Sequence, residues 1–190
     1  EHLTDISELV VKEQAHLGIV VDPDVDRLAF ISEDGEMFGE EYTLVACADY
    51  VLSKTPGNTV SNMSSSRALR DVTNAHKGSY EASAVGEVNV VELMKKNNAI
   101  IGGEGNGGII YPELHYGRDS LVGVALFLTH LANKKMKVSA LRASYPEYYM
   151  SKNKIELTPQ IDVDAILVAM TDKYKNEDIT TIDGVKIDFA

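Results

Sequence analysis

Three aspartates and an arginine fall within six residues of an otherwise apolar stretch, as Asp22, Asp24, Asp26 and Arg27. In an extended backbone, residues two apart point to the same side, so this spacing predicts that the three carboxylates share one face. Like charges this close repel one another, and a hard cation such as Mg²⁺, which prefers oxygen ligands, relieves the repulsion. The planar guanidinium of Arg27 suits a phosphate group. The stretch therefore predicts a metal site that handles a phosphorylated substrate.

A second polar pair lies in a glycine-rich loop over 102–108, where five of seven residues are glycine. Glu104 and Asn106 can offer an acceptor pair and an amide to vicinal hydroxyls. A glycine-rich turn with solvated side chains explains the loop equally well. Its spacing also matches a dinucleotide-binding fingerprint, but that fingerprint must open a helix. Because 109–111 predicts a strand that ends at Pro112, we exclude dinucleotide binding.

Two other signatures compete for the aspartates. An EF-hand loop has aspartates at the same spacing but needs a glycine where Arg27 stands, and its flanks are helical, so we exclude it. A haloacid-dehalogenase-type phosphatase also ends an apolar strand in Asp-x-Asp and uses the first aspartate as nucleophile, which would be Asp22. The register of Asp26 and Arg27 does not fit that class, but it stays open as the alternative.

Composition excludes several classes of protein. The net charge is −11, and the first 41 residues hold twelve of the 29 acids but only two of the 18 bases, so no basic stripe for nucleic acid is present. No apolar run approaches the roughly 18–20 residues of a membrane helix. Cys47 is the single cysteine, which excludes an intramolecular disulfide and a cysteine-based zinc site. We expect a cytoplasmic protein without nucleic-acid or membrane partners.

Helical and strand-like segments alternate along the middle of the chain. Apolar periodicity and turn residues predict helices over 4–16, 40–53, 67–76, 87–97, 119–132 and 161–174. The same patterns predict strands over 17–21, 27–32, 59–63, 79–85, 99–101, 109–111, 154–158, 179–182 and 185–189. Thr4 and Asp119 are expected as helix caps. The helix over 119–132 is apolar nearly all round, so we expect it to be buried against its own sheet and against a neighbouring domain. The alternation predicts an α/β fold, with a mixed sheet flanked by helices.

Taken together, the two loops resemble those of the α-D-phosphohexomutase superfamily, which includes phosphoglucomutase, phosphomannomutase and phosphoglucosamine mutase. In that family an Asp-Gly-Asp-Gly-Asp-Arg loop binds Mg²⁺, and a Gly-Glu-x-Ser/Asn-Gly loop recognises the sugar. Here the two read Asp-Pro-Asp-Val-Asp-Arg over 22–27 and Gly-Glu-Gly-Asn-Gly over 103–107, in the same order. The segments 85–94 and 116–119 also resemble family sequences, so the resemblance covers nearly the whole chain.

The resemblance implies part of a four-domain enzyme that interconverts hexose 1- and 6-phosphates through a phosphoserine and a bisphosphate sugar. Residues 1–37 would be the end of domain 2, 38–144 domain 3, and 145–190 a linker with the start of domain 4. The family's phosphoserine loop and its phosphate-gripping loop belong to other domains. We therefore expect the chain to need those domains as partners and to be inactive alone. A phosphorylated glucose, mannose or glucosamine would be the substrate.

The resemblance also implies roles for individual residues. The ligands of Mg²⁺ would be Asp22, Asp24 and Asp26. Arg27 would be catalytic, because it would support the transferred phosphate. The contacts to the substrate would come from Glu104, Asn106, Glu87 and Arg118. For Glu87 a helix N-terminal charge, and for Arg118 an ordinary surface role, are the plainer alternatives.

Two departures from the family pattern bear on these roles. Pro23 and Val25 replace the usual glycines of the aspartate loop (residues 22–27), which leaves the three carboxylates in place. The segment 62–67 lacks a lysine that many relatives carry there. The Ser-Asn-Met sequence over 61–63 is closer to phosphoglucosamine mutases and favours that substrate. A metal- or sugar-phosphate-binding module without catalysis is the other reading of the isolated chain.

Overall fold

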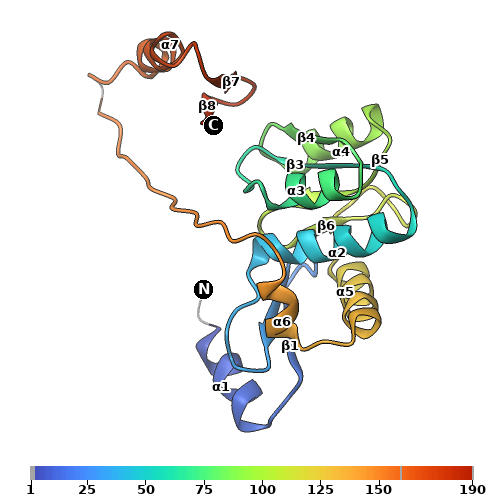
Figure 1. The fold of residues 1–190 in the computed structure, drawn as a ribbon. Helices are drawn as coiled ribbons and strands as arrows, with labels where there is room; N and C mark the ends of the chain where they lie inside the picture. The colour runs from blue at the N-terminus through green and yellow to red at the C-terminus, as the bar shows by residue number, and fades with distance from the viewer. Residues whose placement is uncertain (1–2, 159, 190) are drawn as a thin grey trace. The chain divides into compact units, whose positions relative to one another are not determined.

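The computed structural model describes residues 3–158 and 160–189 and shows two compact units, divided between Tyr148 and Tyr149 (Figure 1). The first unit holds the aspartate loop and the glycine loop (residues 102–108), so every predicted site residue lies in it. Among the described residues, no helix is long and apolar enough to cross a membrane.

A four-stranded mixed sheet forms the centre of the first unit. In spatial order its strands are β4 (Tyr80–Ser83), β3 (Asn58–Asn62), β5 (Ala99–Glu104) and β6 (Gly108–Ile110). The first three are parallel, and β6 runs antiparallel to β5. Because parallel neighbours need crossover connections, α3 and α4 join β3, β4 and β5 in turn. The expected mixed sheet flanked by helices is confirmed.

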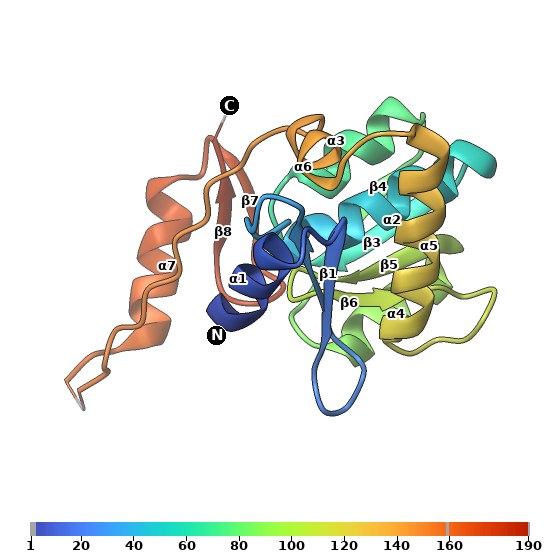
Figure 2. The same cartoon turned by 90° about the horizontal axis from the view of Figure 1, so that it is seen from below.

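Helices cover both faces of this sheet. The helices of the first unit that pack on it are α2 (Glu40–Lys54), α3 (Ala68–Ala75), α4 (Glu87–Lys96) and α5 (Ser120–Lys134). Buried side chains of α2, α3 and α5 share one core with Ile101 and Ile109, whereas Val90 and Met94 of α4 pack on Val60 in a second core. The two cores lie on opposite faces of the sheet, and Figure 2 shows α5 beside α2 in the first layer.

Asp119 caps α5 as predicted, since its Oδ1 accepts a hydrogen bond from the backbone N–H of Val122. Within the first unit, this helix is buried on one face only. Leu121 is 68% exposed and Leu128 41%, while Gly123 and Phe127 face the core. Helix α5 therefore carries more apolar side chains than the first unit buries.

The N-terminal segment adds α1 (Thr4–Lys12) and an antiparallel hairpin of β1 (Leu17–Val21) and β2 (Leu28–Ser32). α1 is shorter than predicted, and Leu3 occupies the cap position, so Thr4 is not a side-chain cap. β2 is fully buried. The ring of its Phe30 stacks on that of Phe127 of α5, with 3.8 Å between the ring centroids. β1 pairs with β2 alone among the described strands, and its Ile19 is 42% exposed.

A short helix that the sequence did not predict, α6 (Val138–Ala143), leads to the end of the first unit. Tyrosines fix the chain after it. The hydroxyl of Tyr42 donates to the carbonyl of Pro146 at 2.7 Å and accepts from the N–H of Tyr148 at 3.0 Å, and the hydroxyl of Tyr148 donates to Asp71. The chain is thus held against α2 and α3 until the first unit ends.

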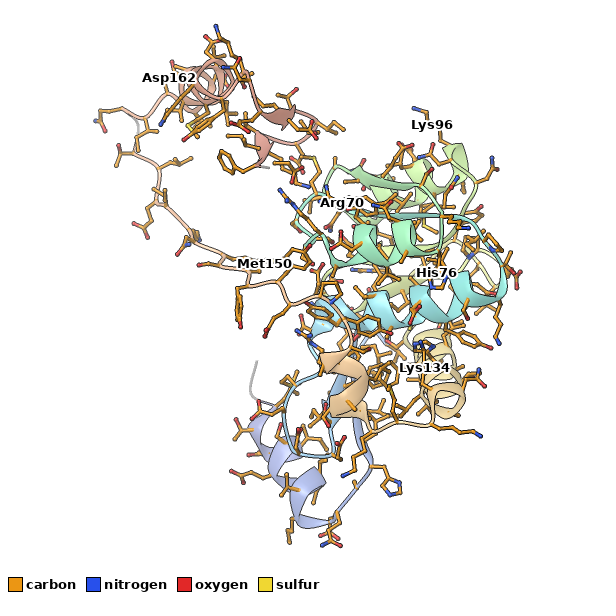
Figure 3. All side chains as sticks on the ribbon, in the orientation of Figure 1. Arg70, His76, Lys96, Lys134, Met150 and Asp162 are labelled. Carbon is orange, nitrogen blue, oxygen red and sulfur yellow. The ribbon has the colours of Figure 1, made fainter. Side chains whose placement is uncertain are left out.

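A partly buried carboxylate of α2 links that helix to the end of α3 and to α5. Asp49 of α2 lies 2.7 Å from Nε2 of His76, 3.1 Å from Nε2 of His130 and 3.6 Å from Nζ of Lys134. The hydroxyl of Tyr145 also donates to it at 3.2 Å. Figure 3 labels His76, which directly follows α3, and Lys134, the last residue of α5. We call these five residues the Asp49 cluster.

The second unit contains α7 (Val163–Lys173) and a hairpin of β7 (Asp178–Thr180) and β8 (Lys186–Asp188). Asp162 caps α7, because its Oδ1 accepts from the N–H of Ala165. The predicted strand over 154–158 is wrong, since this stretch has no regular secondary structure and is exposed. An alternating apolar pattern forms a strand only where a neighbouring strand can pair with it.

Candidate functional site

Polar side chains end two adjacent parallel strands at the carboxyl edge of the sheet. Asn62 is the last residue of β3 and Glu104 the last of β5, and both are buried. The amide of Asn62 donates to Oε1 of Glu104 at 2.8 Å, and its Oδ1 accepts from the hydroxyls of Ser64 and Ser65 at 3.0 and 3.1 Å. In sheets of this kind, ligands bind outside the carboxyl ends of the strands. The strand ends therefore hold Glu104 ready at such a position.

The aspartate loop forms the turn between β1 and β2. Oδ1 of Asp22 accepts from the N–H groups of Asp26 and Arg27, both at 3.1 Å, and Oδ2 accepts from Nε of Arg27 at 2.8 Å. Asp24 is exposed. One carboxylate thus organises the loop, and a second lies free at its tip.

The expectation of an extended loop with three carboxylates on one face is wrong. The N–H of Val25 bonds to the carbonyl of Asp22 at 3.0 Å, and Val25 has φ +57°. A turn with a left-handed residue breaks the alternation of an extended strand. Val25 stands where the family has a glycine, and it keeps the glycine-like conformation although a β-branched side chain makes it costly.

Arg118 connects the aspartate loop to the strand ends. Its Nη1 donates to Oε2 of Glu104 at 2.8 Å, its Nη2 donates to Oδ2 of Asp26, and its backbone N–H donates to Oε1 of Glu87 at 2.9 Å. Glu87 is the first residue of α4, where a negative charge also suits the helix dipole. The structure thus brings Arg118, Asp26, Glu104 and Glu87 together.

The glycine loop follows β5 with tight backbone geometry. Gly103 has φ +156° and Gly107 φ +87°, and a side chain at either position would overlap backbone atoms. The carbonyl of Gly107 accepts from the N–H of Leu28, so this loop touches β2 directly after the aspartate loop. Oδ1 of Asn106 accepts from the N–H of Gly108 at 3.1 Å.

A cleft of about 510 Å³ lies beside the two loops. Asp22 and Arg27 of the aspartate loop line it together with Asn106 of the glycine loop. Glu40 also lines it. The cleft is thus bounded by both loops.

The charges of the aspartate loop shift the protonation of its carboxylates in opposite directions. The hydrogen bond from the Arg27 side chain holds the pKa of Asp22 well below its usual range, against the effect of partial burial. Burial and the close approach of Asp22 raise the pKa of Asp26, although Arg118 opposes that rise. Asp22 is therefore a firmly ionised carboxylate.

By donor chemistry the aspartate loop fits a hard divalent cation, because it offers three carboxylates and no soft ligand. Its present hydrogen bonds direct Asp22 to Arg27 and Asp26 to Arg118. Within residues 3–158 and 160–189, no three His, Cys, Asp or Glu side chains converge as metal ligands. The ligand types suit Mg²⁺, and the arginines hold two of the three carboxylates.

Sequence reasoning missed two members of this site. Asn62 holds Glu104, and Glu41 of α2 accepts from the N–H of Ser66 at 2.6 Å, which fixes the segment after β3. The signal for Asn62 was available, since polar residues that end two adjacent parallel strands meet at one edge. No comparable signal marks Glu41, which lies 25 residues from its partner.

A three-layered α/β unit carries an acidic loop and a glycine-rich loop on one cleft, and comparisons with known proteins show its family. Residues 39–149 match the family model described as "Phosphoglucomutase/phosphomannomutase, alpha/beta/alpha domain III". The chain belongs to this family, within the phosphohexomutases.

Individual relatives extend this likeness beyond the matched domain. The chain is 32% identical over its whole length to a phosphoglucomutase/phosphomannomutase of Thermococcus kodakarensis, of which it spans 42%. A family protein of Burkholderia thailandensis has the same fold, with a TM-score of 0.79 and 22% identity over 98% of this chain and 40% of that one. So has the Aspergillus fumigatus N-acetylphosphoglucosamine mutase in complex with GlcNAc-6P and magnesium, with a TM-score of 0.54 and 14% identity over 88% of this chain and 47% of that one.

Proposed function

We propose that the chain is part of a Mg²⁺-dependent phosphohexomutase that interconverts hexose 1- and 6-phosphates. The single observation that carries this proposal is the cleft that Asp22, Arg27 and Asn106 line together. It brings a carboxylate loop suited to a cation, a guanidinium suited to phosphate and an amide suited to hydroxyls around one volume. The magnesium in the Aspergillus fumigatus complex supports the choice of cation.

In this proposal Asp22, Asp24 and Asp26 hold Mg²⁺, which neutralises phosphate charge during transfer when it is bound. Arg27 carries a permanent charge beside Asp22 and supports the transferred phosphate. Glu104 and Asn106 hold sugar hydroxyls. The phosphoserine that exchanges phosphate with the sugar, and the loop that grips the second phosphate, belong to other parts of the longer protein.

The phosphatase alternative finds less support in the geometry. Phosphatases of that class carry no third aspartate followed by an arginine in this register, whereas Asp26 and Arg27 stand here and both donate to Asp22. A mutase and a phosphatase also differ in product, because a phosphatase releases inorganic phosphate from the sugar. Phosphate release therefore separates the two.

Asp24→Asn in the full-length protein tests the proposal most cleanly, since Asp24 is exposed and its loss leaves the bonds of Asp22 intact. We expect wild type to convert glucose 1-phosphate, mannose 1-phosphate or glucosamine 1-phosphate to its 6-phosphate in a coupled assay. EDTA should stop this, and Asp24→Asn should slow it about a hundredfold or more, since the charge stabilisation by a metal is worth several kcal/mol.

Residues 1–190 alone should show no turnover under the same conditions. Mutase activity that resists both EDTA and Asp24→Asn would contradict the role of the aspartate loop. Release of inorganic phosphate without isomerisation would replace the mutase by the phosphatase.

A further inference from the structure

One guanidinium in the site faces three carboxylates from three separate segments. Arg118 donates through Nη1 to Glu104 at the end of β5 and through Nη2 to Asp26 of the aspartate loop. Its Nε lies 3.4 Å from Oε2 of Glu87, at the start of α4, without hydrogen-bond geometry. The side chain does not line the cleft. It connects the two loops through Asp26 and Glu104.

The backbone fixes Arg118 in this position. Arg118 pairs with Ile110 of β6 in an antiparallel bridge, and the next N–H, of Asp119, donates to Ile109 at 2.8 Å. A side chain at Gly108 would overlap Cδ and Cγ of Arg118, so this glycine makes room for it. Because both the backbone and the aliphatic part of Arg118 are held in place, its ion pairs differ from those of a mobile surface arginine.

Asp26 cannot serve a cation and Arg118 equally. The side chain of Arg118 is only 19% exposed and that of Asp26 25%, so solvent screens their attraction incompletely. Arg27 stands 3.8 Å from the other oxygen of Asp26. A divalent ion at the aspartate loop would meet a fixed guanidinium that already neutralises one of its ligands.

We propose that Arg118 is a positioning residue that competes with the cation for Asp26 and passes the state of the aspartate loop to Glu104. This inference rests on the proposed function, because it assumes a cation at the loop. When a cation binds Asp26, the guanidinium loses that carboxylate and turns wholly to Glu104 and Glu87. Cation binding then changes the contacts of the glycine loop through Arg118, although no residue of the glycine loop is a metal ligand.

Cation binding without sugar tests the competition. The dissociation constant of Mn²⁺ is measured by calorimetry on the full-length protein and on Arg118→Gln and Arg118→Lys. Competition predicts about tenfold tighter binding in Arg118→Gln, since a charge beside a divalent ion is removed. Arg118→Lys should bind about threefold more tightly, because an ammonium lacks the fork that spans Asp26 and Glu104. Arg70→Gln, which changes net charge equally on α3, should stay within about twofold.

A purely structural role predicts the opposite sign. If Arg118 merely builds the site, both variants weaken Mn²⁺ binding or leave it unchanged, and that result overturns the inference. Arg118→Lys keeps the test valid if Arg118→Gln does not fold, because it retains a charge among the carboxylates. Absence of Mn²⁺ binding in the wild type would overturn the proposed function itself, and the inference with it.

Hydrogen exchange tests the connection to Glu104. Mg²⁺ alone should change amide exchange across 102–110 in the wild type by at least about twofold, and this change should vanish in Arg118→Lys while persisting in Arg70→Gln. An equal change in Arg118→Lys would show that the glycine loop senses the metal by another route and would overturn this half of the inference.

Discussion

Replacing Asp49 by asparagine should destabilise the first unit without touching the cleft. Asp49 is the one carboxylate of the Asp49 cluster, and its side chain is 15% exposed. It accepts from His76 at 2.7 Å, while Tyr145 and His130 approach its other oxygen at 3.2 and 3.1 Å. Asparagine has nearly the same shape but carries no charge. Its NH₂ group replaces one acceptor oxygen, so its N–H donors face the donor groups of the neighbouring side chains.

The magnitude follows from the hydrogen bonds that Asp49→Asn loses. A hydrogen bond to a charged group contributes about 1.5–3 kcal/mol, and breaking a buried ion pair from one side costs about 3–5 kcal/mol. Asparagine keeps one acceptor oxygen, so we expect the free energy of unfolding to fall by about 2–4 kcal/mol at pH 7.

The loss should also depend on pH. Burial raises the pKa of Asp49, but the hydrogen bonds from His130 and His76 outweigh burial and hold it well below its usual range. A lowered pKa in the folded state means stabilisation that is present above the unfolded value, near 3.9, and disappears as the pH falls through the folded value. The difference between wild type and Asp49→Asn should therefore be full at pH 6–7 and shrink steadily below about pH 4.

Urea unfolding of the purified chain, followed by circular dichroism between pH 3 and 7, measures this difference. Glu92→Gln is the matched control, because it removes the same charge from an exposed position on α4 and should change stability by less than about 0.5 kcal/mol. A loss at Asp49→Asn below about 0.5 kcal/mol at pH 7, or one of equal size at pH 3, would refute the reasoning.

Three further substitutions have definite expected outcomes. Val25→Gly should raise the free energy of unfolding by about 0.5–1 kcal/mol, and with it the midpoint of thermal unfolding, because glycine adopts φ +57° without strain. A lower midpoint would show that Val25 makes compensating contacts. Gly78→Ala should cost about 2 kcal/mol or more in the same measurement, since its Cβ would overlap the carbonyl oxygen of Gly57; an unchanged midpoint would mean that this backbone yields. Tyr148→Phe removes the bond to Asp71 and should cost about 1 kcal/mol while leaving Mn²⁺ binding unchanged, which calorimetry checks; altered Mn²⁺ binding would contradict the separation of this tyrosine from the cleft.

Local patterns carried most of the fold. Helices α2 to α5, the cap at Asp119 and the C-terminal hairpin all form as expected. Helix α6 was not predicted, because it is only six residues long. Val138 and Leu141 are its buried residues, and two apolar positions do not make a recognisable helical period. The expected strand over 154–158 failed for the converse reason, since Ile155 and Leu157 alternate without a neighbouring strand to pair with.

Sequence patterns pointed to the two loops of the candidate site but not to their arrangement. Motif spacing identified Asp22 and Glu104, and the structure sets the loops that carry them around one edge of the sheet. Local sequence contains no information on the pairing of Arg118 with Asp26, which joins positions 92 residues apart. The turn at Val25 was hidden too, because a β-branched residue ordinarily signals extended backbone.

The open side of β1 has a consequence for how the chain behaves in solution. The strand pairs on one side with β2, no other described strand covers its second side, and Ile19 and Val21 are about 40% exposed beside that row of backbone groups. An uncovered, apolar strand edge is a template for another chain. Purified alone, residues 1–190 should therefore self-associate edge to edge as their concentration rises, whereas a longer protein that supplies a neighbouring strand would stay monodisperse.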